Sequence, residues 1–403
     1  MGLAAEFDYT PRVHRKVVFA ATQCGSFAGA ERALLELGGL SLQVKRIWRA
    51  TQRAGDQRLS AQRQMVQAYQ ALPLPARQAS PVASVPEVAC VMMDGGRFQR
   101  RERQPSLAEK EADKATCWRE MKVGCLASLS SEIAAQDPCP QLPATFADPS
   151  RMREIAQEIK RFSAEQEENE TPQENSGESS PKRPGRPQVL EKTVVATEQD
   201  VTEFGPLLAT AAYHRGFHAA PRKAFIGDGS ETNWGVWRKY FSHYTPIVDF
   251  VHALMYVYAA AMAGATSTTG WARYPQWAQW LWSGAVAELL AAIEVRQEEL
   301  GLPDSGEEET PRAQVANALG YLSKQRQRMK YDEYRRQGLP ITSTLIESTI
   351  KQINRRVKGT EKFWSDGIEP MLTLVADYLN GPLTTVSPPA KHPFSATTCQ
   401  QAA

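Results

Sequence analysis

The chain of 403 residues lacks the features that mark secreted, zinc-binding and membrane-spanning proteins. Its six cysteines form no Cys-x-x-Cys pair, so neither a zinc site of standard spacing nor a disulfide framework is expected, and we predict reduced thiols of a cytosolic protein. The N-terminus has no apolar signal-peptide core. The most apolar stretch, residues 248–265, is interrupted by Asp249 and His252, which argues against a membrane span.

An excess of charge of one sign is also missing. The chain has 47 Lys and Arg against 45 Asp and Glu, which leaves a formal net charge of +2. Total charge therefore does not indicate a nucleic-acid binder, and any such signal must come from local patches. At about 150 residues per domain, the length predicts roughly two to three domains, and 42% hydrophobic residues are enough for a core with polar linkers.

The first 75 residues are helical in pattern. Phe27, Ala30 and Leu34 recur at helical spacing, and Gly38-Gly39 ends that helix. A second helix is expected from Ser41 as N-cap, with Val44, Ile47 and Trp48 facing inward and with basic residues facing outward. The outward set consists of Lys45, Arg46, Arg49 and Arg53. This outline favours a DNA-binding helix-turn-helix, and the alternative is a helical hairpin with a solvated basic face.

Short apolar runs predict a sheet. The continuous run of residues 88–93 reads as a buried strand that ends in a turn at Asp94-Gly95-Gly96. Four further strands are expected at residues 118–126, 192–197, 223–226 and 246–248. Residues 253–340 are helical in pattern throughout, with one helix expected over residues 313–336.

The segment between the second and third expected strands is unusual in composition. Residues 151–162 favour a short amphipathic helix, and residues 163–180 are polar and acidic without apolar periodicity, which predicts disorder. The basic, proline-rich stretch that follows contains Lys182, Arg183 and Arg186 around a Gly-Arg-Pro core, and it resembles an AT-hook. A basic, proline-rich linker that touches phosphate or nothing is the favoured interpretation of this stretch.

Three carboxylates stand at positions that suit a cation site. Asp94 and Asp228 each follow an expected strand, and Glu347 lies on a helix expected from Ser343 to Val357. An ionised acid beside a buried strand is costly unless it is paired or bound to a metal, and an oxygen-rich pocket suits Mg²⁺. Two such ions would stabilise both oxygens of a phosphoryl transfer. Each acid alone has an ordinary reading as a turn or surface residue, and Asp249 is a rival for the second acid.

The chain resembles bacterial insertion-sequence transposases of the DDE type, most closely the Kra type, whose motif order is similar to that of Mutator-like enzymes. The resemblance rests on MMDGG, on IGDGSETNW followed by IVDFVHALMY, and on PITSTLIESTIKQINRRVKGTEKFW. It covers most of residues 88–379 and is most specific after Lys192. It implies an α/β fold with an RNase H-like catalytic core of mixed sheet, interrupted by an all-helical insertion and preceded by a helical DNA-binding region.

The resemblance also assigns residues. It makes Asp94, Asp228 and Glu347 the catalytic and metal-binding acids, separated by 228 − 94 = 134 and 347 − 228 = 119 residues. Asp249 and His252 match an Asp-x-x-His element and become supporting residues. From the residues alone, Asp249 is also a helix N-cap and His252 a core or capping histidine. The basic residues after Glu347 are expected to face DNA phosphates, with a solvated surface as the alternative: Lys351, Arg355, Arg356 and Lys358.

The expected function is that of a transposase: metal-dependent hydrolysis at the ends of an element and strand transfer into target DNA. The implied cofactor is Mg²⁺ or Mn²⁺, with two ions, and the implied partners are double-stranded DNA and further copies of the chain. A bacterial, nucleoid-associated location in the cytoplasm and no membrane partner are expected. The alternative is a catalytically inactive or domesticated DNA-binding regulator derived from a transposase, and a nuclease that cuts without joining is a third possibility.

The expected organisation has eight parts: a helical, DNA-binding region (1–75), a linker (76–87), the first part of the core (88–150), an insert (151–191), the second part of the core (192–252), a helical insertion (253–340), C-terminal core helices with the third acid (341–380) and a flexible tail (381–403).

Overall fold

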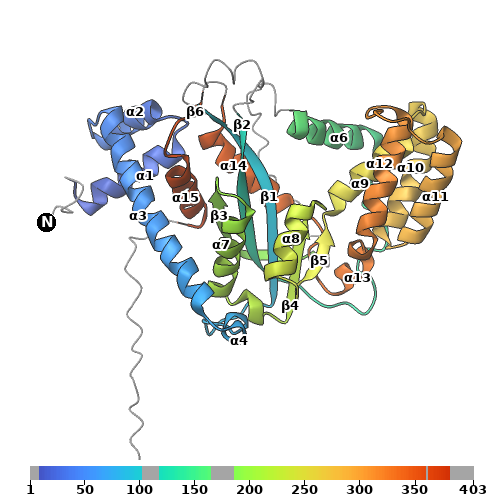
Figure 1. The fold of residues 1–403 in the computed structure, drawn as a ribbon, viewed down its shortest axis with the longest axis horizontal. Coiled ribbons are helices and arrows are strands. Elements are labelled where there is room, and N and C mark those ends of the chain that lie inside the picture. The colour runs from blue at the N-terminus through green and yellow to red at the C-terminus, as the bar shows by residue number, and fades with distance from the viewer. Residues whose placement is uncertain (1–8, 102–117, 165–185, 360–361, 382–403) are drawn as a thin grey trace, which may run out of the picture.

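The computed structural model describes residues 9–101, 118–164, 186–359 and 362–381 (Figure 1). The expected disorder within residues 165–180, the basic residues Lys182 and Arg183, and the tail from residue 382 lie outside the described residues. No helix of the described ranges is both long and apolar enough to cross a membrane.

A mixed, open sheet forms the centre of the molecule, which confirms the expected α/β class. Its five main strands are β1 (Val88–Arg100), β2 (Trp118–Ser130), β3 (Gln188–Thr197), β4 (Arg222–Gly227) and β5 (Thr245–Val248). They stand in the order β3-β2-β1-β4-β5. β1, β2 and β3 pair antiparallel, whereas β4 is parallel to β1 and β5 is parallel to β4. The short β6 (Phe363–Trp364) pairs with the far end of β1. Each of the five apolar runs predicted as strands lies within one of these strands.

β1 differs from the expectation at its middle. The predicted turn at Asp94-Gly95-Gly96 is wrong, because the strand continues to Arg100 and stays paired with β2 along its whole length. Both glycines lie under side chains of β2. A Cβ added at Gly95 would meet the Glu120 carboxylate at 2.4 Å, and one added at Gly96 would meet the end of Met121 at 2.2 Å. Close packing therefore explains these two glycines better than a turn does.

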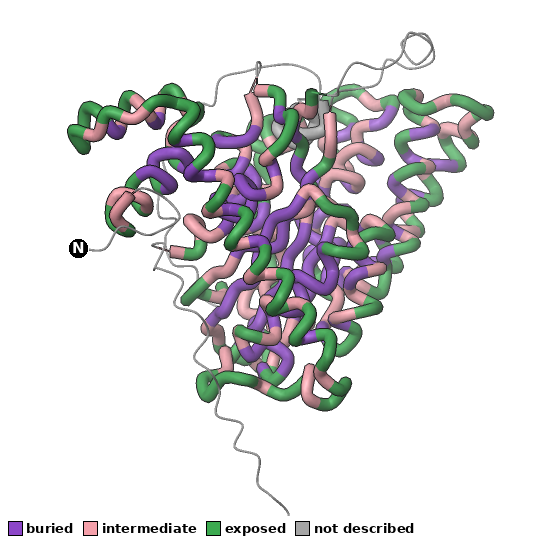
Figure 2. The backbone as a smooth tube through the Cα atoms, turned by 60° about the vertical axis from the view of Figure 1, so that its left-hand side comes forward, coloured by how far each residue is buried: buried purple, intermediate pink, exposed green. Residues whose placement is uncertain are grey.

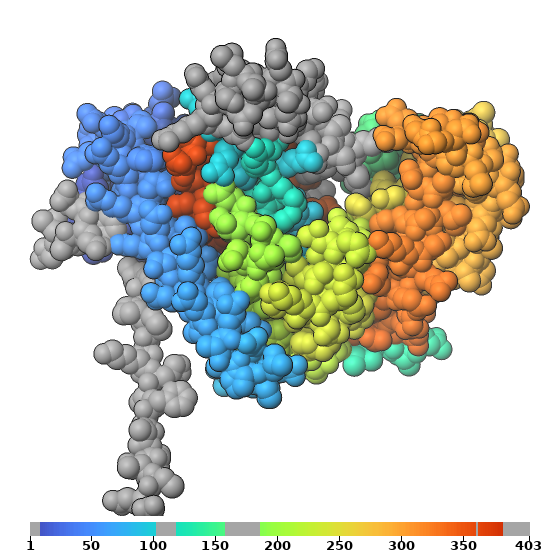
Figure 3. Space-filling view, in the orientation of Figure 1, coloured from blue at the N-terminus to red at the C-terminus, as the bar shows by residue number. Residues whose placement is uncertain are grey.

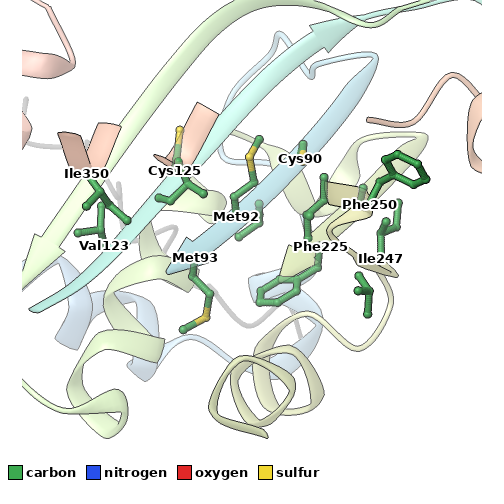
Figure 4. Packing of buried hydrophobic residues seen from close by; sticks show 14 of the residues in the cluster. Cys90, Met92, Met93, Val123, Cys125, Phe225, Ile247, Phe250 and Ile350 are labelled. Atoms are coloured by element: carbon green, nitrogen blue, oxygen red, sulfur yellow. The ribbon is translucent and has the colours of Figure 1, made fainter. Parts of the chain in front are cut away.

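Helices cover both faces of the sheet. These are α7 (Val201–His214), α8 (Glu231–Tyr240), α14 (Thr344–Val357) and α15 (Ile368–Leu379). On one face, Gly124 of β2 lies under Leu208 and Phe204 of α7, and on the other face Gly96 of β1 lies near Ile350 of α14. Figure 4 shows Ile350 beside Val123 of β2 within the core. The middle of the sheet, at residues 88–93 of β1, 123–129 of β2 and 224–227 of β4, is buried (Figure 2), so it is a rigid support for whatever the strand ends carry.

The N-terminal helices form a unit with a small core of their own. They are α1 (Pro11–Gln23), α2 (Phe27–Gly38) and the long α3 (Val44–Ala71), followed by the short α4 (Leu74–Gln78). α2 ends at Gly39, whose φ of 59° suits glycine. Two details of the prediction are wrong. The N-cap of α3 is Gln43 rather than Ser41, and Val44 and Trp48 are exposed. Ile47 is buried as predicted, and the small Ala50 shares its face of α3.

α3 also ties this unit to the rest of the protein. Arg58 of α3 forms a two-pronged ion pair with Asp377 of α15, with Nε to Oδ2 at 2.5 Å and Nη2 to Oδ1 at 3.1 Å. Gly55 of α3 lies so close to Pro370 that an added Cβ would come within 2.4 Å of that ring. The N-terminal helices are therefore packed directly on the C-terminal helix that covers β3 (Figure 1).

Between β5 and α14 the described chain is helical throughout. The helices are α9 (Phe250–Met262), α10 (Ser267–Trp282), α11 (Val286–Leu300), α12 (Pro311–Gln325), the 3-10 turn η3 (Arg326–Arg328) and α13 (Tyr331–Arg336). The single helix predicted for residues 313–336 is thus broken at η3. We call residues 250–336 the helical region; it lies to one side of the sheet (Figure 1). The remaining helical elements are η1 (Ala144–Phe146), α6 (Pro149–Ala164) and η2 (Phe217–Ala219), of which α6 includes the predicted helix at 151–162.

Candidate functional site

The three candidate acids come from separate elements that meet at one edge of the sheet. β4 pairs with β1 only as far as Met92 opposite Ile226, so Asp94 lies on β1 just beyond the end of β4. Asp228 follows the last residue of β4, and Glu347 lies in the first turn of α14, which packs on β1. The topology therefore brings acids that are more than 100 residues apart in sequence to the same place.

The pKa of Asp94 is affected by the other acids nearby. The pKa of Asp94 is raised from 3.8 to about 7, first by burial and also by repulsion from the carboxylates of Asp228, Glu347 and Asp249. A hydrogen bond from the Gly95 N–H to Asp94 Oδ1, 2.7 Å long, opposes this rise. Within the described residues, neither Asp94 nor Asp228 forms an ion pair with Lys or Arg. The negative charges of Asp94 and Asp228 are therefore not compensated by an ion pair within the described residues.

Asp228 is held by a residue that the sequence reasoning missed. Asn233 of α8 is buried, and its Nδ2 donates to Asp228 Oδ1 at 2.8 Å and to the Met93 carbonyl at 3.4 Å. The Ser230 N–H donates to the same Oδ1 at 2.9 Å. Asn233 therefore connects the second acid to the strand that carries the first. The available signal was the position of Asn233 in the first turn of a helix capped by Ser230, directly after Asp228.

Asp249 has a structural role that the sequence allowed as one of its readings. Its side chain is buried, Oδ1 accepts the His252 N–H at 2.7 Å, and Oδ2 accepts the Ser343 N–H. It is thus the N-cap of α9 and also holds the residue before α14. Because both carboxylate oxygens accept backbone N–H groups, Asp228 rather than Asp249 has the more available carboxylate.

His252 is half-buried in the first turn of α9, among aromatic rings. Its ring centroid lies 5.9 Å from that of Tyr256 and 6.1 Å from that of Tyr321. These two tyrosines lie near Asp228. Burial raises the pKa of each tyrosine first, and the charge of Asp228 also raises it. The structure therefore brings His252 to the neighbourhood of Asp228, on the side of the helical region.

The donor set suits a hard divalent cation. Glu347 is exposed, and its Oε1 accepts a long hydrogen bond of 3.4 Å from the Ser343 hydroxyl. Asp94, Asp228 and Glu347 offer carboxylate oxygens, which Mg²⁺ prefers, and a bound cation would relieve the repulsion that raises the pKa of Asp94. As placed, no three His, Cys, Asp or Glu side chains of the described residues gather closely enough to hold one ion.

Most basic residues predicted to meet DNA lie on the surface. Lys45, Arg46 and Arg49 are exposed in the first turns of α3, and Arg46 lies 5.7 Å from the centre of the Tyr9 ring. Arg186 is exposed just before β3. Lys351 and Arg355 are exposed on α14, while Lys358 is half-buried with its ammonium group 5.5 Å from the Trp118 ring centre.

Arg356 is an exception, and its assignment to DNA binding is wrong. Only 4% of this residue is exposed, and its Nε donates to the Ala21 carbonyl at 2.6 Å. The guanidinium lies 4.8 Å from the Phe27 ring centre and 5.3 Å from that of Trp364. Burial lowers the pKa of Arg356 to about 10. This residue joins α14 to the N-terminal helices, so it is a packing residue that the run of positive charges concealed.

The chain was also compared with known proteins. No protein-family model matches it, and no curated protein matches it significantly.

Proposed function

We propose that this chain is a DDE-type DNA transposase with an RNase H-like catalytic core. The strand order and directions support the proposal: three antiparallel strands followed by two that are parallel to the first. Under this proposal, the helical region between β5 and α14 would be the insertion that the resemblance implies, and the N-terminal helices would be its DNA-binding region.

One observation carries the proposal. Acids at the middle of β1, directly after β4 and in the first turn of α14 lie close enough to raise the pKa of Asp94 by mutual repulsion. An arrangement of carboxylates that repel one another costs stability, and this cost is understandable where the acids serve a function. In the motif order of the resemblance these are the three acids, Asp94, Asp228 and Glu347.

The residues of the chain have separate tasks under this proposal. Asp94, Asp228 and Glu347 would hold Mg²⁺, which would supply activation of the attacking water and stabilisation of the leaving oxygen. Asn233 orients the Asp228 carboxylate, and Asp249 holds the start of the helix that carries Glu347. Lys351 and Arg355 lie four and eight residues after Glu347 on the same helix, where they would contact phosphates of the bound DNA.

The test is cleavage of DNA that carries the ends flanking the coding region, with Mg²⁺, with Mn²⁺ and with EDTA. We expect cuts at those ends that require metal, expose a 3′-hydroxyl and disappear in Asp228→Asn, while DNA binding is retained. Asp304→Asn is a matched control, because Asp304 lies in the loop between α11 and α12 and pairs with Arg312 at 3.3 Å. It should cut like the wild type.

Two results would contradict the proposal. If the wild type binds the ends but never cuts them, the inactive, DNA-binding regulator becomes the better description. If Asp228→Asn cuts as well as the wild type, Asp228 is not the second acid. Joining of the cut ends to a second DNA molecule then separates a transposase from a nuclease.

A further inference from the structure

Two side chains of α12 hold the backbone of the turn that carries Asp228. The Tyr321 hydroxyl donates to the Asp228 carbonyl at 2.6 Å, and Gln325 Nε2 donates to the Gly229 carbonyl at 2.8 Å. Consecutive carbonyls of the turn are thus bound by residues one helical turn apart. Figure 3 shows this part of the helical region, in orange, against the residues that follow β4, in yellow-green.

Both donors are themselves held in place. Gln325 is 1% exposed, and its Oε1 accepts a hydrogen bond of 2.7 Å from Arg328. The Tyr321 ring stacks on that of Tyr256 of α9, with ring centroids 3.8 Å apart and planes 12° apart. Both side chains are therefore fixed by their own contacts, and the turn is bound to two groups that do not move easily.

Gly229 makes the close approach of α12 possible. Its φ is +97°, and a Cβ at this position would meet the Tyr321 ring at 2.7 Å. The ring therefore lies directly on the turn. From the other side, Asn233 and the Ser230 N–H hold Asp228 Oδ1. The helical region holds the backbone of the turn, and α8 with the Ser230 N–H holds Oδ1 of Asp228. These contacts together set the position of the other carboxylate oxygen, Oδ2.

We propose that Tyr321 and Gln325 are positioning residues, through which the helical region sets the placement of the Asp228 carboxylate. The inference rests on the proposed function for what Asp228 binds. It implies that α12 does more than pack on the core: a displacement of the helical region moves the second acid.

The experiment compares Tyr321→Phe and Gln325→Met with Tyr331→Phe as a matched control. Tyr331 is fully buried, and its hydroxyl also donates to a backbone carbonyl, that of Val248, at 3.0 Å. The control therefore loses the same kind of hydrogen bond at the end of β5 and should lose similar thermal stability. It removes no hydrogen bond to the carbonyls of Asp228 and Gly229.

Three measurements are made on the full chain: amide hydrogen exchange in residues 227–233, Mn²⁺ affinity by calorimetry and the Mg²⁺ dependence of DNA cleavage. We expect faster exchange in both α12 variants and a Mn²⁺ affinity lowered about tenfold or more, since residues that orient a metal ligand have effects of this size. Tyr331→Phe should keep the exchange and affinity of the wild type.

The results separate the two proposals. If the wild type binds Mn²⁺ and cuts DNA while the α12 variants show unchanged exchange and affinity, the positioning role is refuted and the proposed function stands. If the wild type neither binds Mn²⁺ nor cuts DNA, the proposed function fails. Faster exchange confined to the α12 variants would then still support their hold on the turn, and unchanged exchange would refute that hold as well.

Discussion

Replacing Asp94 by Asn tests the electrostatics of the site through stability alone. The pKa of Asp94 is about 7 in the folded chain against an ordinary value of 3.8, a difference of about 3. Because the folded state raises the pKa of an acid, the folded chain keeps a proton that the unfolded chain has released. Stability is therefore lost as pH rises from about 3.8 to about 7, and the full cost remains above that window.

The size of the effect follows from the same values. At about 1.4 kcal/mol per pKa unit, the full cost is at most about 4 kcal/mol, of which roughly two thirds develops between about pH 5 and about pH 8. Asp94 is only partly buried, so screening by water reduces the expected change to about 2 kcal/mol. Asn keeps an oxygen that accepts the Gly95 N–H, and therefore removes the charge with little change in packing.

Urea unfolding in EDTA at about pH 5 and about pH 8 measures this effect. We compare the free energy of unfolding of Asp94→Asn with that of the wild type at each pH. The advantage of the variant should be about 2 kcal/mol larger at about pH 8 than at about pH 5. Asp304→Asn, which changes an exposed acid, should show no such pH dependence. Added Mg²⁺ should reduce the stability difference between the two proteins at the higher pH, because it compensates the charge of Asp94, which only the wild type carries. A stability difference that is equal at both pH values would refute the reasoning.

Two further predictions concern residues around the site. Asp249→Ala should lower the free energy of unfolding by about 2 to 4 kcal/mol, measured by urea unfolding, because the N-cap of α9 and the acceptor of the Ser343 N–H are both lost; a loss below about 0.5 kcal/mol would contradict this role. Arg355→Ala should make the logarithm of the DNA-binding constant fall less steeply with the logarithm of the salt concentration, by about the contribution of one phosphate contact. Arg356→Ala should leave that dependence unchanged but destabilise the fold by about 2 to 3 kcal/mol, and equal binding effects of the two would contradict our correction.

The strands could be predicted from sequence because they are short apolar runs. Residues 88–93 and 224–226 are buried, and their sequences are continuously apolar. Two helices that cover the sheet were not predicted. α7 contains the pair Gly205-Pro206, which usually ends a helix, yet Gly205 is needed because an added Cβ would meet the Tyr240 ring at 2.5 Å. Tertiary packing therefore explains a glycine that local propensity alone would place at the end of a helix.

The wrong details share a physical cause. Val44 and Trp48 were expected inside because they are apolar, but α3 meets its neighbours through small residues such as Ala50 and Gly55, which let helices approach closely. Arg356 was expected outside because it is charged, but two aromatic rings and one carbonyl receive it. Residue type alone does not reveal a partner that lies hundreds of positions away in sequence.

The three acids singled out in the sequence lie within electrostatic reach of one another. Asp228 follows β4 and Glu347 lies in the first turn of α14, whereas Asp94 lies within β1 rather than after it. The residues that hold them were not found. Asn233, Tyr321 and Gln325 carry no charge and belong to no spacing pattern, and the donors on α12 act on backbone atoms of the turn. Such contacts depend on how the helical region docks, which a one-dimensional pattern does not contain.

The pairing of β1 with β4 has a consequence for how the protein is made. Val88 lies opposite Arg222, a separation of 222 − 88 = 134 residues, and the helix that carries Glu347 packs against β1 from still farther along the chain. Contacts of such long range form slowly and late. A ribosome must release nearly the entire polypeptide before the acids can meet. A chain truncated before residue 344 would therefore lack Glu347 and, with it, the complete group of acids. It would also lack α15, on which α3 packs.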